Sequence, residues 1–285
     1  MHSEYIIKNT KFMDPSADYF SVKTYPQFQQ KLQKFQSQLV TDVNAGKPKT
    51  YYKFGDGDYY FLKKEKRGSA KPGRRALKKP YYLINHKKFV TGAQKNDVYL
   101  SLIQKTNSLM FRELFNKDFD YPSEFSYGLL SNKWLLQSVT DKVGIIGADK
   151  KIEIIFELMK RKEYQHYLGL DSFEDYISIP QLFACDNLNK TIKNVKKQIS
   201  KSKAHLYLVG VGHVKSGLLS ELKQFRNAVF LDVGVGIDAL AGIINLSRPY
   251  FGDWQNFQFK NKSIYEEIDF LVNKVNNIKN INFID

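Results

Sequence analysis

Apolar positions follow two alternating patterns along the chain and so predict its secondary structure. In the second half, short apolar runs typical of buried strands alternate with segments whose apolar residues recur every three or four positions, as on one face of a helix. The predicted strands are residues 142–147, 175–179, 205–211 and 228–233, and the predicted helices are residues 150–162, 190–203, 215–225 and, as a short helix or turn, 236–246. This alternation with short connections is typical of a parallel, doubly wound sheet.

The first half is less regular. Its pattern predicts helices over residues 26–43, 96–115 and 131–139, and a short strand over residues 50–54. Residues 1–24 resemble an irregular arm. We therefore expect a single α/β domain over residues 25–285, with a Rossmann-like, mostly parallel, doubly wound sheet flanked by helices, and with residues 63–88 as an inserted basic loop.

Composition excludes several classes of protein. With 42% hydrophobic and 14% aromatic residues, the chain has too much apolar surface to stay disordered. A single cysteine, Cys185, excludes a disulfide framework and a cysteine-rich zinc site. No apolar run is long enough to span a membrane, and the first residues lack the apolar core of a signal peptide, so we expect a cytoplasmic protein.

The net charge of +15 is concentrated in two segments. Residues 63–88 contain eleven basic residues and one acidic residue, a net charge of +10, and residues 190–203 contain six lysines and no acid. The first, with Gly68, Pro72 and Gly73, predicts a mobile surface loop, and the second predicts an amphipathic helix. Each segment is either a solvated face or a basic surface that attracts the phosphates of a nucleotide, a nucleic acid or an anionic membrane.

Two carboxylates, Asp56 and Asp58, flank Gly57 at the end of the strand predicted over residues 50–54. Both can approach one hard divalent cation, and Mg²⁺ or Mn²⁺ would accept these oxygens together with diphosphate oxygens. The alternative is an ordinary polar turn.

A glycine-rich segment, residues 210–217, joins a predicted strand to a predicted helix. Backbone N–H groups at Gly210 and Gly212 favour phosphate there, and His213 and Lys215 add positive charge. The segment matches neither the dinucleotide fingerprint nor the Walker loop. The alternative is a tight turn at the edge of the sheet.

Two further acids, Asp232 and Asp238, lie near the carboxyl end of the last predicted strand. Either can act as a general base or bind sugar hydroxyls, and either can be a helix cap or turn carboxylate. Arg248 begins a cation-and-aromatic segment that ends at Trp254 and can stack on a base or sugar, or pack as an aromatic cluster. The sequence contains no G-x-S-x-G elbow and no H-E-x-x-H, which argues against acyl hydrolases and zinc enzymes.

The segment GKPKTYYKFGDGDYYFL, residues 46–62, resembles the opening motif of GT-D-type glycosyltransferases, in which Arg-Phe-Gly-Asp-Gly-Glu carries two metal-linked acids. Phe54, Gly55, Asp56 and Gly57 match that motif, whereas Lys53 stands in place of the arginine, and the glutamate is replaced by Asp58. The glycine-rich stretch over residues 206–243 is also similar to the family.

The resemblance implies a metal-dependent enzyme that moves a sugar from a nucleotide diphosphate donor, with UDP as the expected nucleotide, to a glycan or glycoprotein acceptor. It places Mn²⁺ or Mg²⁺ on Asp56 and Asp58. The residues expected to bind the nucleotide are Lys53, Gly55, Gly210, Gly212, His213, Lys215 and Arg248. Asp232 or Asp238 would deprotonate the acceptor if the enzyme inverts.

Two alternatives remain open at this point. One is a metal-dependent nucleic-acid-binding protein or nuclease that uses the basic segments, although nucleases of this kind need three or more clustered carboxylates. The other is a non-catalytic protein of the membrane surface or a scaffold. Peripheral contact with an anionic membrane is compatible with the enzyme as well.

Overall fold

The structure, a computed structural model, describes residues 28–132, 136, 139, 143–243, 256–268 and 281–284. The predicted arm over residues 1–24 and the site residue Arg248 lie outside these ranges, as does Trp254. None of the helices within them combines the length and apolar character that a membrane crossing needs.

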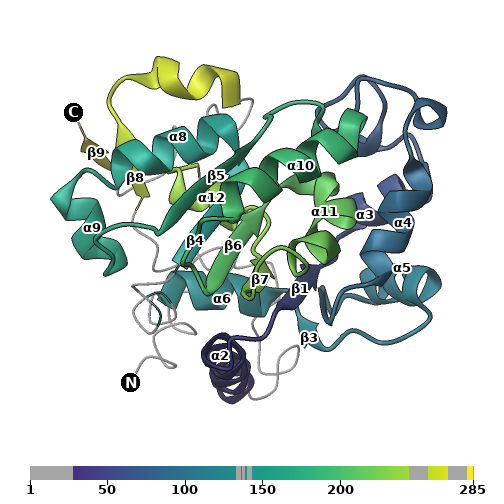
Figure 1. The fold of residues 1–285 in the computed structure, drawn as a ribbon, viewed down its shortest axis with the longest axis horizontal. Coiled ribbons are helices and arrows are strands. Elements are labelled where there is room, and N and C mark those ends of the chain that lie inside the picture. The colour runs from purple at the N-terminus through teal and green to yellow at the C-terminus, as the bar shows by residue number, and fades with distance from the viewer. Residues whose placement is uncertain are drawn as a thin grey trace.

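A seven-stranded parallel sheet forms the centre of the molecule, with the order β3-β2-β1-β7-β6-β4-β5 (Figure 1). Its strands are β1 (Lys49–Lys53), β2 (Val98–Ser101), β3 (Tyr121–Pro122), β4 (Val143–Ala148), β5 (Asp175–Ile179), β6 (Leu206–Gly210) and β7 (Val229–Asp232). A second, two-stranded parallel sheet pairs β8 (Asn256–Phe259) with β9 (Ile281–Ile284). The predicted α/β class and doubly wound parallel sheet are therefore confirmed.

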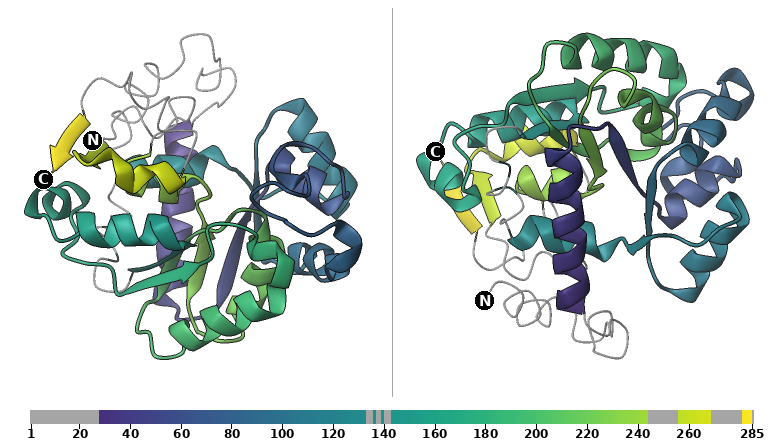
Figure 2. Two further views of the ribbon diagram at one scale, coloured as in Figure 1. Left: turned by 90° about the horizontal axis from the view of Figure 1, so that it is seen from above. Right: turned by 60° about the horizontal axis from the view of Figure 1, so that its bottom comes forward.

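Side chains alternate between the two faces of the sheet, as the period of a strand requires. Tyr51 and Ile145 belong to one hydrophobic cluster, and their chain neighbours Tyr52 and Ile146 belong to the other. The first face is covered by α2 (Phe28–Asn44), α6 (Glu124–Asn132), α8 (Asp149–Leu158), α9 (Lys162–Leu168) and α12 (Gly236–Leu240). In Figure 2, α2 is the purple helix.

The second face is covered by α3 (Asp56–Leu62), α4 (His86–Gln94), α5 (Lys105–Phe115), α10 (Leu188–Ile199) and α11 (Lys215–Leu222). The chain runs from β1 outward to β3 at one edge, enters the other half at β4, and returns through β6 and β7 to lie beside β1. The connections that follow β1 and β7, which are neighbours in the sheet, leave to opposite faces, and so do those that follow the neighbours β4 and β6. Ligands of open α/β sheets bind at such points, outside the carboxyl ends of the strands.

The helix predicted over residues 96–115 is only partly correct. Residues 105–115 form α5, but Val98–Ser101 form β2, which is buried at every position between β1 and β3. The Asp97 carboxylate accepts hydrogen bonds from the backbone N and the hydroxyl of Thr50, at 2.8 and 2.9 Å, and so aligns β2 with β1. A four-residue apolar run fits a helix and a buried strand equally well, and here the pairing partner decides. The helix predicted over residues 131–139 falls largely outside the described residues.

The basic segment runs along the surface and is anchored to the fold. It contains two short 3-10 turns, η2 (Gly68–Ala70) and η3 (Tyr81–Leu83), and its last residues begin α4. Leu77 is fully buried, and the Tyr81 hydroxyl donates to the Ala70 carbonyl at 2.6 Å. These contacts give a loop rich in lysine and arginine a defined position.

Candidate active site

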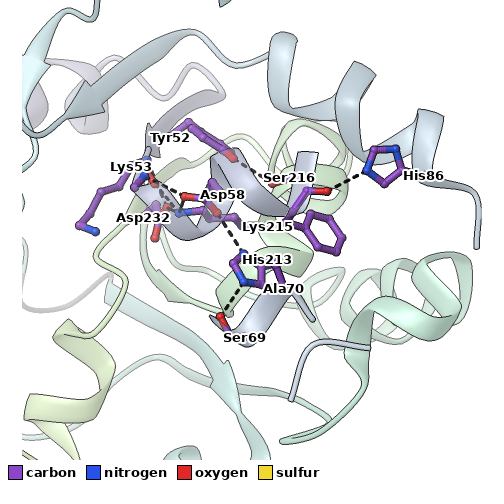
Figure 3. Close-up of polar contacts among 12 residues, drawn as sticks. Tyr52, Lys53, Asp58, Ser69, Ala70, His86, His213, Lys215, Ser216 and Asp232 are labelled. Carbon is purple, nitrogen blue, oxygen red and sulfur yellow. Dashed lines mark hydrogen bonds and ion pairs between the residues drawn. The ribbon is translucent and has the colours of Figure 1, made fainter. Parts of the chain in front are cut away.

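A buried lysine, Lys215, occupies the carboxyl ends of β1 and β7 (Figure 3). It is the first residue of α11, and only 6% of its surface is exposed. Its Nζ lies 3.0 Å from Asp58 Oδ2 and 2.8 Å from Asp232 Oδ2, and it also donates to the backbone carbonyl of Lys53. Three acceptors from three elements therefore match the three N–H bonds of one ammonium.

The charges of this cluster stabilise one another. Burial alone would lower the pKa of Lys215, but the Asp232 and Asp58 carboxylates raise it well above its usual value. Burial alone would raise the pKa of Asp58, but the Lys215 ammonium and the hydrogen bond from His213 lower it to about 2. The lysine and Asp58 are therefore both ionised at neutral pH, as a buried pair must be to offset its desolvation.

The carboxylate of Asp232, the last residue of β7, also accepts hydrogen bonds from neighbouring backbone N–H groups. It accepts from the Lys53 N–H at 3.1 Å and from the Gly234 N–H at 2.9 Å, and 1% of the residue is exposed. These bonds tie β7 to β1 and set the turn that follows. With the Lys215 ammonium, Asp232 thus has three donors from the protein itself.

The two acids of the Asp-Gly-Asp motif do not converge. They lie in the first turn of α3, where residues two positions apart point about 200° apart around the axis. Asp58 turns inward and accepts from the Gly55 N–H at 3.0 Å, which caps the helix, whereas Asp56 is exposed to solvent. Among the described residues, no group of three or more His, Cys, Asp or Glu side chains could hold a metal ion. The arrangement therefore does not fit the chelating pair expected from the sequence.

His213 connects this cluster to the neighbouring loop. Its Nδ1 lies 3.4 Å from Asp58 Oδ1 and its Nε2 lies 2.9 Å from the Ser69 hydroxyl of the basic loop. Its ring stacks on Phe61 with a centroid distance of 5.1 Å. A side chain at position 57 would meet the imidazole at 3.1 Å, which gives a packing reason for the glycine of the Asp-Gly-Asp motif.

The glycines of the 210–217 segment have separate structural roles. Gly212 has a φ of +58°, a left-handed conformation that favours glycine, and a Cβ there would meet open space. A Cβ at Gly210 would lie 2.3 Å from Ile237 and 2.5 Å from the Gly234 carbonyl oxygen. Gly210 thus allows β6 to pack against the turn before α12, and Gly212 turns the chain into η6 (Gly212–Val214).

A cavity of about 220 Å³ opens at the carboxyl ends of β4, β5 and β6. We call it the β4–β6 cavity, and it lies where the connections after β4 and β6 leave to opposite faces. Its polar and reactive lining comprises Ser69 and Arg75 of the basic loop, Lys151 of α8, Gln181, Cys185, and the turn over residues 210–214. Burial raises the pKa of the Cys185 thiol. The thiol is therefore neutral and unreactive, and it adds no charge to the cavity wall. Because His213 lines the cavity and also faces Asp58, the cavity and the lysine cluster are adjoining sites.

The structure thus brings together part of the predicted set. Gly55, Asp58, His213, Lys215 and Asp232 share one network, and Lys53 joins it through its backbone. The Lys53 side chain instead points toward the Tyr127 ring, with Nζ 5.1 Å from the ring centroid. Asp238 lies apart on α12 and forms an ion pair with Lys151.

Sequence reasoning missed Ser69, Lys151 and Cys185 as cavity residues. Ser69 and Lys151 lie on segments that carried only a charge or helix signal in the sequence. No motif marks any of the three, since only the packing of the basic loop over β4 and β6 brings them into one wall.

The two basic segments also meet on the surface. The backbone N–H groups of Lys78 and Lys79 donate to the Asp186 carboxylate at 3.0 and 3.1 Å, immediately before α10, and Lys88 Nζ donates to Asn189 at 3.1 Å. Between these lysines, Tyr82 and Leu83 are 82% and 58% exposed. We define the basic surface as Lys78, Lys79, Tyr82, Leu83, Lys87, Lys190 and Lys193, all of them exposed.

Comparisons with known proteins give structural similarity alone. No family model matches the chain, and no curated protein matches it either. One similar solved structure is described as a new glycosyltransferase (DUF1792) from Streptococcus sanguinis, with 15% sequence identity, a TM-score of 0.48, and coverage of 81% of this chain and 95% of that chain. Another, a selenomethionine-substituted domain of unknown function 1792, has 12% identity, a TM-score of 0.45, and coverage of 89% and 98%.

Proposed function

We propose that this protein is a glycosyltransferase that moves a sugar from a nucleoside diphosphate donor, with UDP as the nucleotide, to a glycan or glycoprotein acceptor. One observation carries the proposal. His213 of the glycine-rich turn stands between Asp58 of the motif that resembles GT-D enzymes and the β4–β6 cavity at the carboxyl edge of the sheet. Donor nucleotides of Rossmann-like folds bind at this edge.

The departing nucleoside diphosphate gains negative charge as the glycosidic bond breaks, and the cavity wall has groups that stabilise it. Arg75, Lys151 and the His213 imidazole lie in the lining, together with the backbone of the Gly212 turn. Preorganised donors of this kind lower the barrier most when they are aimed at the charge that develops. Lys215 contributes only indirectly, because its three N–H bonds are already donated to Asp58, Asp232 and Lys53.

An inverting transfer needs a base for the acceptor hydroxyl. Of the two predicted carboxylates, Asp232 is fully buried and bound by Lys215 and two backbone N–H groups. Asp238 is paired with Lys151, whose side chain lines the cavity. We therefore assign the acceptor base to Asp238, the one of the two that lies beside a cavity residue.

The nuclease alternative has little support. Metal-dependent phosphodiester cleavage of that kind needs several clustered carboxylates, and the described part of the chain holds no such group. No step of the proposed transfer depends on a divalent metal.

The first test is a thermal-shift panel of nucleosides, nucleoside diphosphates and nucleotide sugars. We expect UDP and at least one UDP-sugar to raise the Tm, His213→Ala to remove this rise, and His166→Ala, an exposed histidine on α9, to retain it. Slow hydrolysis of the same UDP-sugar would then identify the donor. The absence of a shift with every nucleotide would refute the donor site.

We also propose that the basic surface contacts an anionic membrane. Its lysines attract acidic headgroups, each worth about 1 kcal/mol near such a surface. Tyr82 and Leu83 add an exposed aromatic and aliphatic pair that suits the interface between water and lipid. The cytoplasmic leaflet is the one rich in acidic lipid, which agrees with the location expected from the sequence.

A further inference from the structure

The Lys215 ammonium is surrounded by oxygen atoms of the kind that a divalent cation prefers. The Asp58 carboxylate comes from α3, the Asp232 carboxylate from β7 and the Lys53 carbonyl from β1. Carboxylate and carbonyl oxygens are the ligands of Mg²⁺ and Mn²⁺ in proteins. In this molecule the oxygen cluster already contains a cation, which the chain supplies from α11.

The surroundings of the ammonium leave its position well defined. The ring of Tyr52 lies 5.0 Å from Nζ, and its hydroxyl is 2.8 Å from the Ser216 hydroxyl, which follows Lys215 in α11. The Gly55 N–H and the Lys53 N–H occupy further lone pairs of Asp58 and Asp232. Each carboxylate is therefore engaged by both an ammonium and the backbone.

We propose that Lys215 is a built-in cation that takes the place of a divalent ion at the Asp-Gly-Asp motif, so that Asp58 and Asp232 bind no metal. An ion at ligand distance from Asp58 Oδ2 would be forced against the ammonium, and two cations repel strongly at that separation. Displacing the lysine would leave its charge buried without partners, since 6% of the residue is exposed. This proposal holds whether or not the protein transfers a sugar.

Binding of Mn²⁺ to the protein without nucleotide tests the proposal directly. The chain is freed of metals with EDTA, and Mn²⁺ is titrated while free Mn²⁺ is followed by electron paramagnetic resonance. We expect no stoichiometric binding that depends on Asp58. The matched variants are Asp58→Asn, which alters the buried acid, and Asp56→Asn, which alters the exposed acid of the same helical turn.

The results of the Mn²⁺ titration distinguish the built-in cation from a metal site on Asp58 and Asp232. Absence of binding, or binding that Asp56→Asn removes and Asp58→Asn retains, supports the proposal. Stoichiometric binding by the wild type that Asp58→Asn or Asp232→Asn removes overturns it. Because the measurement involves no donor, its result is independent of whether UDP binds in the β4–β6 cavity.

Replacing Lys215 removes the ammonium, and the expected effect of a divalent metal is then the opposite of that expected for the wild type. Lys215→Ala leaves two carboxylates and a carbonyl around an empty position, so we expect the variant to have a lower Tm than the wild type and to regain stability in Mn²⁺ or Ca²⁺. A Lys215→Ala protein as stable as the wild type and indifferent to both ions would contradict the proposal. If this variant does not fold, the requirement for a cation is supported, and the Mn²⁺ titration of the wild type decides whether a metal binds.

Discussion

Lys215 Nζ lies 2.8 Å from Asp232 Oδ2, and this buried ion pair joins the beginning of α11 to the end of β7. The same carboxylate accepts from the Lys53 N–H, so that three elements of the sheet edge share one charge pair. His213, which faces Asp58 and lines the β4–β6 cavity, connects this ion-pair network to the cavity.

Breaking this pair is expected to destabilise the protein strongly. Asp232→Ala leaves a buried ammonium short of a partner, and loss of one member of a buried pair costs about 3–5 kcal/mol. Urea denaturation gives the free energy of unfolding. Glu157→Ala, which removes an exposed partner of Lys160 at 2.6 Å, is the control and should change stability little. Equal effects of the two substitutions would contradict the structural importance of the pair.

The lowered pKa of Asp97 predicts how the stability of the fold changes in acid. Burial alone would raise the pKa of this carboxyl, but bonds from Lys223 and Thr50 lower it below its usual value. A lowered pKa stabilises the fold above the unfolded-state pKa near 4, and the contribution is lost as pH falls through the folded-state value. Asp97→Ala should therefore be less stable than the wild type at pH 7, and the difference should shrink as the pH falls below 4. Thermal melts from pH 7 to pH 2 measure it, and a constant difference would count against this role.

Gly210 is expected to tolerate no side chain. A Cβ there would meet Ile237 at 2.3 Å and the Gly234 carbonyl at 2.5 Å, so Gly210→Ala should cost about 1–3 kcal/mol or more through overpacking. Gly55→Ala is the comparison, because its Cβ would meet only the Asp58 carboxylate at 3.9 Å. Similar melting temperatures for the two variants would argue against this explanation of Gly210.

Asp238→Asn tests the proposed acceptor base. Loss of a general base lowers the rate about 10²–10⁴-fold, so we expect a large fall in kcat for transfer with little change in the UDP-induced Tm shift. Glu153→Gln on α8 carries the same kind of change at an exposed position and should retain activity. Unchanged kcat in Asp238→Asn would assign the base to another group or favour a retaining reaction.

The basic surface predicts binding to acidic vesicles. Co-sedimentation with phosphatidylglycerol-containing vesicles should exceed that with phosphatidylcholine alone and should decrease with salt. Replacing Tyr82 and Leu83 by serine should reduce it, whereas Leu109→Ser should not, although Leu109 of α5 is 54% exposed. Equal binding to both kinds of vesicle, or retention of binding to RNA instead, would contradict a membrane contact.

Several elements follow from local sequence alone. The continuous apolar runs of β4, β6 and β7 and the helical spacing of α2 and α10 carry their own signal, because a side chain's periodicity reports which face of a strand or helix is buried. From these the sequence established a parallel α/β sheet, and it marked Asp58, His213, Lys215 and Asp232 as residues near strand ends. For β2 the sequence pattern predicts a helix instead, since a four-residue run has no distinguishing period.

Only the tertiary structure decided how those residues are related. The pairing of β1 with β7 is a contact between distant parts of the chain, and no local pattern encodes it. That pairing brings Lys215 between Asp58 and Asp232, and the start of α3 directly after β1 separates Asp56 from Asp58 by the rotation of a helix. Likewise, the packing of the basic loop against the start of α10 joins two charged segments into one surface. Composition determined how much positive charge the protein carries, but long-range packing determined what that charge faces.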